Sequence, residues 1–580
     1  MKNEARQKDI ACVIFRKNIQ GRPKQVMLNE EDVHGQVLDH LGLVSSVISR
    51  LKLIEKIDAR IKVSKDNGAK VTMGQRVAAM ILNGLGFTDD RLYLFPQFLE
   101  NKPIGRLLGQ GLSANDFNDD ALGRCLDAIS DYGVTPFFSE VALEIGLNEG
   151  LLGHSAHFDT TSINVYGEYD VDKSTTPAPL SATPTFTITH GHSKDHRPDL
   201  KQMVLNLATT GAAAFPVWME SHSGNASDKK ILQEGASKMH AFCKQLKNSP
   251  TFLYVGDSAF YERCVKAQVP FKWLSRAPER LNEVKKWIQL PEDTFTWQLL
   301  GNGYKMTPLL DAVYGDVSQR WLMIFSEKAA TRELKTLKKQ IQKELDEYSK
   351  VVWHLSNQEF KCNHDAQRAG LEAVKGLKYH QVTWTTNPIE KHSGRGRPKK
   401  DAALVTLGCR ITGEIIENSR LVELIKCCKG RFILATNQLD QKVLPDIELL
   451  SEYKKQYKTE QGFAFIKGDT FEVASIFLKK PSRIEALMMI MTLCLMVYSF
   501  AQYQLRQALE KANETIPDQQ KKPTKTPSMA WVFRLFHGIQ VWIVRQHDLN
   551  QELVVNLSSL KRRIIQYFGP EATRIYSASG

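Results

Sequence analysis

Three carboxylates have the residue type and the surroundings for binding a divalent metal ion. Asp159 lies within the β-branched segment "HSAHFDTTSINVYG", and Asp257 directly follows the apolar segment "TFLYVG". A carboxylate in a strand that is otherwise buried is costly unless charge compensates it. When two such strands are neighbours in one sheet, their carboxylates can share an Mg²⁺ or Mn²⁺ ion, and a third from a facing helix completes an oxygen-rich site.

A second interpretation of the two aspartates needs no metal. Asp159 can cap a bulge in its strand, and Asp257 can cap the helix that follows it. Spacing alone does not choose between this interpretation and a metal site.

Glu460 is the candidate for the third carboxylate. It lies in "EYKKQYKTEQGFAFIKG", residues 452–468, which has the pattern of an amphipathic helix ending at a glycine. With 3.6 residues per turn, four side chains fall within about 60° of one another: Tyr453, Gln456, Glu460 and Lys467. Phe463 borders this stripe and can fix the helix to a sheet. The pattern permits Glu460 to face a sheet, although a solvated surface helix permits it too.

The elements that must position these carboxylates are predicted in residues 151–280 and 451–515. The first segment reads β-β-β-α-β-α-β, an α/β layer with a mixed sheet, and the second resumes that layer. The predominantly apolar run 486–501 has sixteen residues, fewer than the ~20 that span a bilayer, which indicates a buried core helix.

Three further segments surround this layer. Residues 1–150 are predicted to be mainly helical, with Thr72 as the N-cap of a T-x-x-Q capping box. Residues 281–450 form an α+β insertion whose charged helix carries an apolar stripe, more typical of a packing face than of a dimer zipper. Residues 516–580 are predicted to be a small helical tail.

The composition favours a polyanionic partner in a reducing compartment. The 580 residues carry 77 Lys and Arg against 64 Asp and Glu, a net charge of +13. The nine cysteines are scattered and form no C-x2-C pair, which disfavours a disulfide framework and a zinc site. The first residues contain no signal-peptide core. We therefore expect a cytoplasmic protein.

The sequence resembles a known family. The aspartates of "HFDTTS" and "YVGDSAFY" and a helix of the form Y-x2-R-x3-E-x6-K are similar to the DDE transposases of bacterial insertion sequences, in the superfamily called "insertion sequence four". Here glutamine, Gln456, stands where arginine is usual. Further similar segments extend the resemblance over nearly the whole chain: "NGLGFTDDRLYLFPQFLENKPIGRLLG", "NDDALGRCLD", "GHSKDHRPDLKQ", "GRPKKD" and "RFILATNQLD".

The resemblance implies a ribonuclease-H-like core interrupted by the insertion, and a metal-dependent reaction on DNA. Asp159, Asp257 and Glu460 would hold two Mg²⁺ or Mn²⁺ ions for cleavage at the element ends and strand transfer. The partners would be double-stranded DNA, both the terminal inverted repeats and the target, and a second copy of the chain in a synaptic complex. The protein would be associated with the bacterial nucleoid and not with a membrane. A non-catalytic derivative that binds DNA, and a nuclease of the same fold, remain alternatives.

The resemblance also implies that the helical domain of residues 1–150 binds DNA, and it assigns DNA contacts near the metals. Tyr453 and Lys467 would contact phosphates of the terminal nucleotides, and Gln456 would stand beside them. For Lys467, the alternative is a cation that stabilises the helix C-terminus.

Other predicted DNA contacts come from basic loops and a strand end. "SGRGRPKKD" contains an AT-hook core, in which Arg395 and Arg397 can enter an A·T minor groove and Lys399 and Lys400 can reach phosphates. The alternative is a solvated loop, or one that touches only backbone phosphates. The others are Lys194 and Arg197, in a loop that can face DNA, and Arg276, which can face the active site or form a strand-end salt bridge. The H-x3-H pair His192 and His196 is interpreted as polar loop residues, not zinc ligands.

Overall fold

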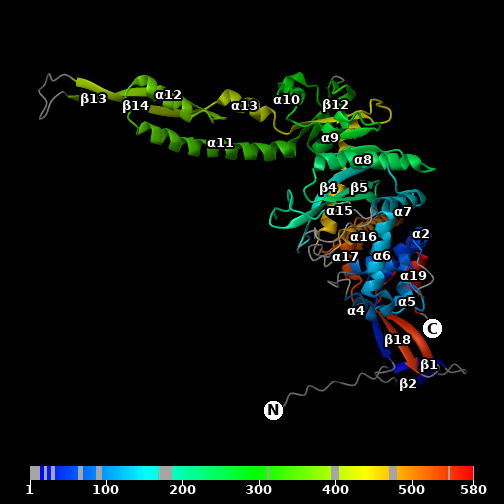
Figure 1. Cartoon of the computed structure of the whole chain (residues 1–580). Helices are drawn as coiled ribbons and strands as arrows, with labels where there is room; N and C mark the ends of the chain where they lie inside the picture. Colours follow the sequence, from blue (N-terminus) through cyan, green and yellow to red (C-terminus); the bar gives the residue numbers. More distant parts are fainter. Residues whose placement is uncertain are drawn as a thin grey trace, which may run out of the picture. The chain divides into compact units, whose positions relative to one another are not determined.

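The chain folds as two compact units. Unit 1 comprises Met1–Arg263, Val269–Lys272 and Glu452–Gly580, and unit 2 comprises Cys264–Gln268 and Trp273–Ser451. Figure 1 colours the elements along the chain. The computed structural model describes residues 13–17, 23–27, 33–62, 70–86, 94–167, 169, 186–309, 312–392, 404–468, 478, 480–546 and 549–578.

Unit 1 contains a mixed sheet in the order β6-β5-β4-β7. Its strands are β4 (Ser155–Val165), β5 (Lys201–Thr210), β6 (Phe215–Ser223) and β7 (Leu253–Gly256). β5 pairs antiparallel with β4 and β6, whereas β7 pairs parallel with β4. The helices α8 (Asp228–Gln245) and α9 (Ser258–Lys266) precede and follow β7. With β8 (Trp273–Arg276), the chain order is β-β-β-α-β-α-β, so the predicted order and the mixed sheet are confirmed.

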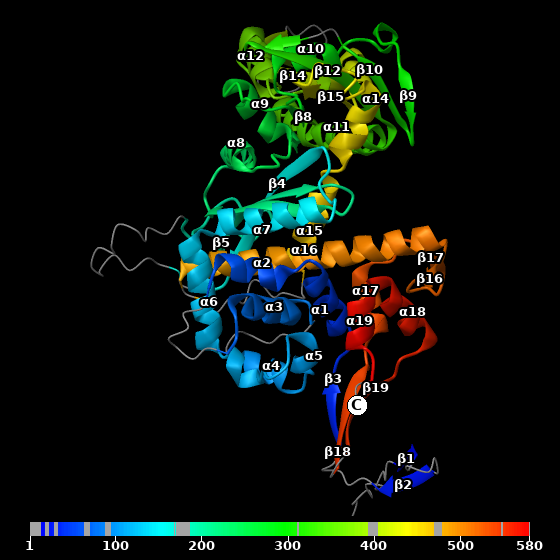
Figure 2. The same cartoon turned by 90° about the vertical axis from the view of Figure 1, so that its right-hand side faces the viewer.

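The helix α16 (Pro481–Ala512) is the main core element of unit 1. By length and composition it could cross a membrane, but 78% of its most apolar stretch is buried inside the protein, as predicted for a core helix. It contacts β6 and several of the N-terminal helices (Figure 2). Those helices are α1 (Leu41–Arg50), α2 (Leu53–Arg60), α3 (Met73–Gly84), α4 (Phe95–Glu100), α5 (Ile104–Leu107), α6 (Asp119–Tyr132) and α7 (Val134–Asn148).

The N-terminal helices begin with the predicted local signals. The Thr72 side chain accepts from the Gln75 backbone, and the Gln75 side chain accepts from the Thr72 backbone, so the capping box at the start of α3 is confirmed. Two strands before the helices form a separate pair, β1 (Val13–Lys17) and β2 (Pro23–Met27).

The prediction of a helical tail for residues 516–580 is wrong in part. β18 (Gln540–Gln546) pairs with β19 (Leu549–Val555) and also with β3 (Val33–Val37) from the other end of the chain. "QVWIVRQ" is rich in β-branched and aromatic residues, which favours a strand once a partner is available. The remaining tail elements are β16 (Ile516–Pro517), β17 (Pro523–Thr524), α17 (Met529–Leu535), α18 (Ser559–Phe568) and α19 (Pro570–Ile575).

Unit 2 contains most of the predicted insertion. A second run of strands has the order β8-β15-β12-β10-β9, and β11 pairs with β12. The long helix α11 (Glu327–Ser356) contacts the two-stranded ribbon of β13 and β14 and the helix α12, along which it extends (Figure 1). The elements are α10 (Asn282–Ile288), β9 (Gln298–Gly301), β10 (Tyr304–Pro308), β11 (Ala312–Tyr314), β12 (Val317–Ser326), α12 (Asn363–Ala373), β13 (His380–His392), β14 (Leu404–Glu417), α13 (Ser419–Cys427) and β15 (Arg431–Thr436).

Candidate active site

The register of β4 and β7 brings Asp159 and Asp257 to the same level of neighbouring strands. His157 of β4 lies opposite Val255 of β7 in a parallel pair. Asp159 and Asp257 each come two residues later along their chains. Because parallel strands advance together, the two carboxylates lie at the end of β7, where it gives way to α9. The sheet therefore provides the juxtaposition that a shared metal ion requires.

The segment that carries Glu460 is two helices, not the single helix expected from its periodicity. α14 (Asp446–Lys454) ends in a tight turn, in which the backbone N–H groups of Lys455 and Gln456 donate to carbonyls three residues earlier. α15 (Tyr457–Ile466) then begins, with Gln456 at its N-cap position. The single stripe from 453 to 467 is therefore wrong, although Glu460 is in the first turn of α15.

α15 is held on β4 and β5 by polar contacts. The Thr459 hydroxyl lies 2.7 Å from that of Thr209 and 3.2 Å from the carbonyl oxygen of His157, to which it donates. Gln456 Nε2 donates to the carbonyl oxygen of Phe158 at 3.5 Å. The glutamine in the usual arginine position thus binds the strand that carries Asp159.

Gly462 allows the close approach of α15 to the core. A Cβ atom built on this residue would lie 3.0 Å from Leu495 of α16 and 3.7 Å from Leu207 of β5. Glycine in a helix costs roughly 1 kcal/mol relative to alanine, and here that cost accompanies close packing. Leu207 pairs with Asp159 across the strands, so this packing holds α15 over the site.

A buried cluster anchors the end of α14 to the same strand. The Ser155 hydroxyl donates to the Glu452 carboxylate and lies 2.8 Å from His157 Nε2, which is 3.4 Å from that carboxylate. These contacts, with Lys455, lower the pKa of Glu452 to about 2 despite burial, and burial lowers that of His157. Both oxygens approach the same ring nitrogen, so the histidine is not placed as a relay between them. The cluster holds the helix.

The three carboxylates share one electrostatic environment. Ser155, His157 and Asp159 alternate onto one face of β4, the face on which Glu452 packs. Burial, together with the negative charges of Asp257 and Glu460, raises the pKa of Asp159 to about 6. Burial also raises the pKa of Asp257. Such mutual repulsion is relieved by a cation.

The donor set fits hard divalent cations, but the carboxylates do not form a closed ligand cage. All three supply oxygen, the ligand that Mg²⁺ and Mn²⁺ prefer. Within the described parts of the chain, no three acidic, histidine or cysteine side chains come close enough together to hold one ion. Mg²⁺ commonly binds through one or two carboxylates and completes its shell with water and phosphate oxygens, so the arrangement fits ions shared with a nucleic acid.

Lys194 and Asp228 belong to the site, and only the lysine was predicted to have a role. Lys194 Nζ donates to the carbonyl oxygen of Thr160 at 2.6 Å and lies 3.2 Å from the Asp228 carboxylate. Its charge lowers the pKa of Asp159 and Asp257, whereas that of Asp228 raises the pKa of Asp257. Nothing in the sequence separates Asp228 from the carboxylates usual in a helix's first turn.

A cavity of about 340 Å³ adjoins these groups. Lys194, Asp228 and His192 are among its lining residues. Asp159, Asp257 and Glu460 are not among the residues that line it, so the cavity adjoins Lys194 and Asp228 rather than the three candidate metal ligands.

The other predicted DNA contacts are placed as follows. Lys467 lies 2.9 Å from Asp195 in an ion pair, and Arg197 lies 2.6 Å from Asp199. Tyr453 is half-buried near the end of α14. The structure does not test their roles with DNA.

Arg276 belongs to unit 2, where it pairs with Glu279 and lies 5.0 Å from the ring centre of Phe432. Arg276 therefore forms the strand-end salt bridge, which is the alternative to facing the active site. Four predicted contacts lie outside the described residues: Arg395, Arg397, Lys399 and Lys400.

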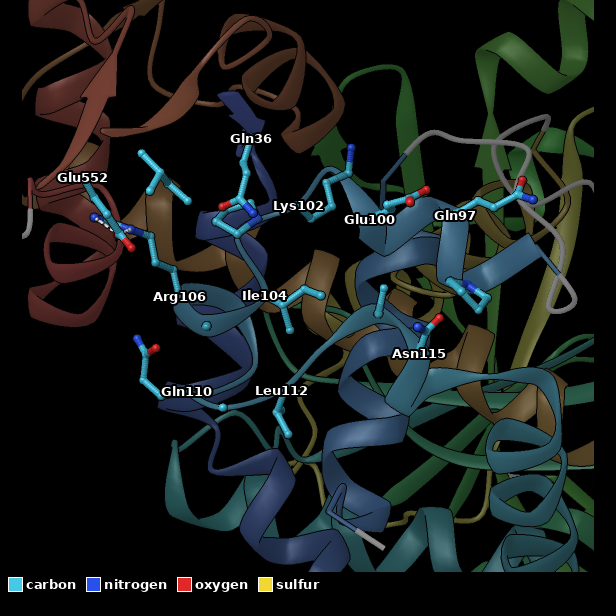
Figure 3. Close-up of a pocket in the computed structure, with 16 residues that line it drawn as sticks. Gln36, Gln97, Glu100, Lys102, Ile104, Arg106, Gln110, Leu112, Asn115 and Glu552 are labelled. Atoms are coloured by element: carbon cyan, nitrogen blue, oxygen red, sulfur yellow. Dashed lines mark hydrogen bonds and ion pairs between the residues drawn. The ribbon is translucent and has the colours of Figure 1, made fainter. Parts of the chain in front are cut away.

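A second cavity, of about 540 Å³, lies where β3 and α5 approach β18 and β19, and no carboxylate cluster lines it (Figure 3). Arg106 points at Glu552 there, and the Nε atom donates to the carboxylate at 2.7 Å. Its Nη1 atom also donates to the carbonyl oxygens of Ile575 and Ser577. This buried arginine connects α5 to the C-terminal tail, so we interpret the cavity wall as a structural junction.

Comparison with known proteins gives limited matches. Residues 33–143 match a family model described as "Domain of unknown function (DUF4277)". No curated protein matches the sequence. The chain is similar to a solved structure described as "Cryo-EM structure of piggyBac transposase synaptic complex with hairpin DNA", at 8% identity and a TM-score of 0.32, covering 86% of this chain and 78% of that one. That TM-score is too low to support a function.

Proposed function

We propose that this protein is a DNA transposase that cleaves the ends of an insertion sequence and joins them to target DNA. One observation carries the proposal: two other carboxylates lie close enough to Asp159 for their charges to raise its pKa. They are Asp257, at the end of the parallel neighbouring strand, and Glu460, on a packed helix. Such a convergence of acidic side chains is unfavourable in an isolated protein and is stabilised by divalent cations.

Asp159, Asp257 and Glu460 would hold two Mg²⁺ or Mn²⁺ ions, which supply Lewis acidity for in-line displacement at phosphorus. The chain itself contributes position. β4 and β7 fix the two aspartates, while Thr459 and Gly462 fix α15 and therefore the backbone of Glu460. Positioning and charge neutralisation account for most catalysis in phosphoryl transfer.

Lys194 would compensate the carboxylates while no metal is bound. Its ammonium group already favours the ionised forms of Asp159 and Asp257. When metals and DNA enter, the same cation can turn to a phosphate, because it is on an exposed loop and not in the core.

The sequence resemblance supports the finer assignment. It favours a ribonuclease-H-like core of the "insertion sequence four" type, a synaptic dimer, and terminal inverted repeats as the DNA recognised. Gln456 would replace the usual arginine by a neutral anchor to β4. The same resemblance favours Tyr453 and Lys467 as contacts to terminal phosphates.

The proposal is tested with purified full-length protein and duplex DNA that carries the inverted repeats flanking its gene. We expect nicking at the repeat ends with Mg²⁺ or Mn²⁺, none in EDTA, and none by Asp159→Asn, which should still bind the DNA. Wild-type binding without nicking would instead indicate a non-catalytic derivative. Cutting that ignores the end sequence would indicate a nuclease.

A further inference from the structure

The exposed face of α11 in unit 2 carries six cations in one stripe. At ~100° per residue, these side chains fall within about 80° of one another around the helix. All six are exposed, and the buried residues Leu337 and Leu355 lie on the opposite face. The members of the stripe are Lys328, Arg332, Lys335, Lys339, Lys343 and Lys350.

The charges of α11 are segregated in a way that an ordinary solvated helix does not need. Among described residues, no ion pair involves any of the six cations. The acidic Glu344 faces inward and accepts from the backbone N–H groups of Lys378, Tyr379 and His380. Glu333 likewise accepts from the Gly430 N–H.

One acidic residue interrupts the stripe. Asp346 accepts from Gln342 on the same face of the helix. A helix stabilised by surface pairs alternates Glu and Lys at four-residue spacing, whereas six cations against one carboxylate leave this face strongly positive.

The dimensions of the stripe match duplex DNA. Lys328 and Lys350 are 22 residues apart, which at ~1.5 Å per residue is about 33 Å. One turn of B-DNA is about 34 Å long. The opposite side of the helix packs along β14 and α12, and this packing fixes which face of α11 is exposed. The six cations are therefore held on a rigid helix.

We infer that the α11 stripe is a sequence-independent docking surface for the phosphate backbone of double-stranded DNA, about one helical turn in length. The inference rests on the proposed function for its choice of DNA as the partner. It adds a contact surface in unit 2 that the catalytic carboxylates do not provide.

The test compares two variants with the same loss of charge. Lys339→Gln/Lys343→Gln removes two cations from the stripe, whereas Lys285→Gln/Lys286→Gln removes two exposed cations from α10. Binding to a 30-base-pair duplex of unrelated sequence is measured by fluorescence anisotropy in EDTA, over a series of salt concentrations. Glutamine keeps helix propensity, and circular dichroism checks folding.

We expect the stripe variant to bind about tenfold more weakly near 100 mM salt, with the slope of log K against log salt reduced by about 0.9 for each lost contact. The α10 variant should bind as wild type does. Equal binding by wild type and the stripe variant would overturn this inference and leave the proposed function standing. A stripe variant that binds single-stranded DNA more weakly than wild type, but binds the duplex equally well, would also overturn it. A wild type that binds no DNA would overturn the proposed function as well.

Discussion

Glu452 shows how a single buried charge positions the candidate active site. Its carboxylate accepts from Ser155, approaches His157 and pairs with Lys455 at 2.6 Å. These partners outweigh desolvation, since the pKa falls from its ordinary 4.5 to about 2. Because the partners include two residues of β4, the charge fixes the corner between α14 and α15.

Glu452→Gln should therefore destabilise the protein in a pH-dependent way. A carboxyl whose pKa is lower in the folded state stabilises that state above the unfolded pKa of ~4.5, and this stabilisation is lost as the pH falls towards 2. At pH 7 the free energy of unfolding should drop by about 2–3 kcal/mol. Urea unfolding at pH 7 and pH 4 measures this, and the variant should lose less stability than wild type on acidification. An equal loss in both proteins would contradict the assignment.

At the residue scale, the sequence predicted the types of side chain in the site better than their partners. Asp159 could be predicted because a charge within an apolar strand is unusual, and Asp257 because it directly follows such a strand. The position of Lys194 against β4 and its pairing with Asp228 could not, because both are in segments where polar residues are ordinary. Which charges meet depends on how the loop before β5 returns over the sheet.

At the scale of elements, the close packing of α15 on β5 and α16 is the feature on which the site depends. Gly462→Val would place branched carbon where the nearest side-chain atom is 3.0 Å from an added Cβ. We expect the variant to lose about 1–3 kcal/mol of stability through overpacking and to cleave DNA more slowly, since α15 must move away from β4.

Gly468→Val is the matched control for Gly462→Val. An added Cβ at Gly468 meets only backbone oxygens at 3.3 Å, at the end of the helix and away from the core side chains. Thermal unfolding and cleavage rates are compared for the two variants. If Gly462→Val unfolds and cleaves as the control does, the packing of α15 does not position the site.

The regular elements were predicted from the sequence, and the irregular ones were not. Alternation and β-branched residues indicated β4 and β5, and the Thr72 capping box indicated the start of α3. The turn at Lys455 and Gln456 was not predicted because the residues on both sides favour helix, and the contacts that accompany the bend, such as that of Gln456 with β4, are tertiary. β18 and its hairpin partner β19 were not predicted, and β3, the other partner of β18, is about 500 residues away in the sequence.

At the scale of the whole molecule, unit 1 is assembled from both ends of the chain. The segment matched by the family model, residues 33–143, contains β3, which pairs with β18, and Arg106, which binds Glu552. The catalytic candidates from residues 155 to 257 and 457 to 466 lie in the same unit. Folding of the site therefore requires the tail as well as the N-terminal helices.

Arg106→Ala should unfold unit 1 more readily. The substitution leaves Glu552 without its buried partner and removes the donor to the carbonyl oxygens of Ile575 and Ser577. Because Glu552 is only half-buried, the main cost is that of the lost charged hydrogen bonds to it and to the two carbonyl groups, about 1.5–3 kcal/mol. Arg574→Ala, which removes an exposed pair with Glu571, is the control and should cost less than about 1 kcal/mol. Similar melting temperatures for both variants would argue against the junction.

The most direct test of the central claim is the rate of metal-dependent cleavage at the element ends in four variants. Asp159→Asn, Asp257→Asn and Glu460→Gln each remove one proposed metal ligand, and Glu448→Gln removes an exposed carboxylate of α14 as a control. We predict that each of the first three lowers the cleavage rate by at least about 10²-fold while DNA binding persists, and that the control cleaves as wild type does. Cleavage at the wild-type rate by Glu460→Gln, or by either aspartate variant, would contradict the account.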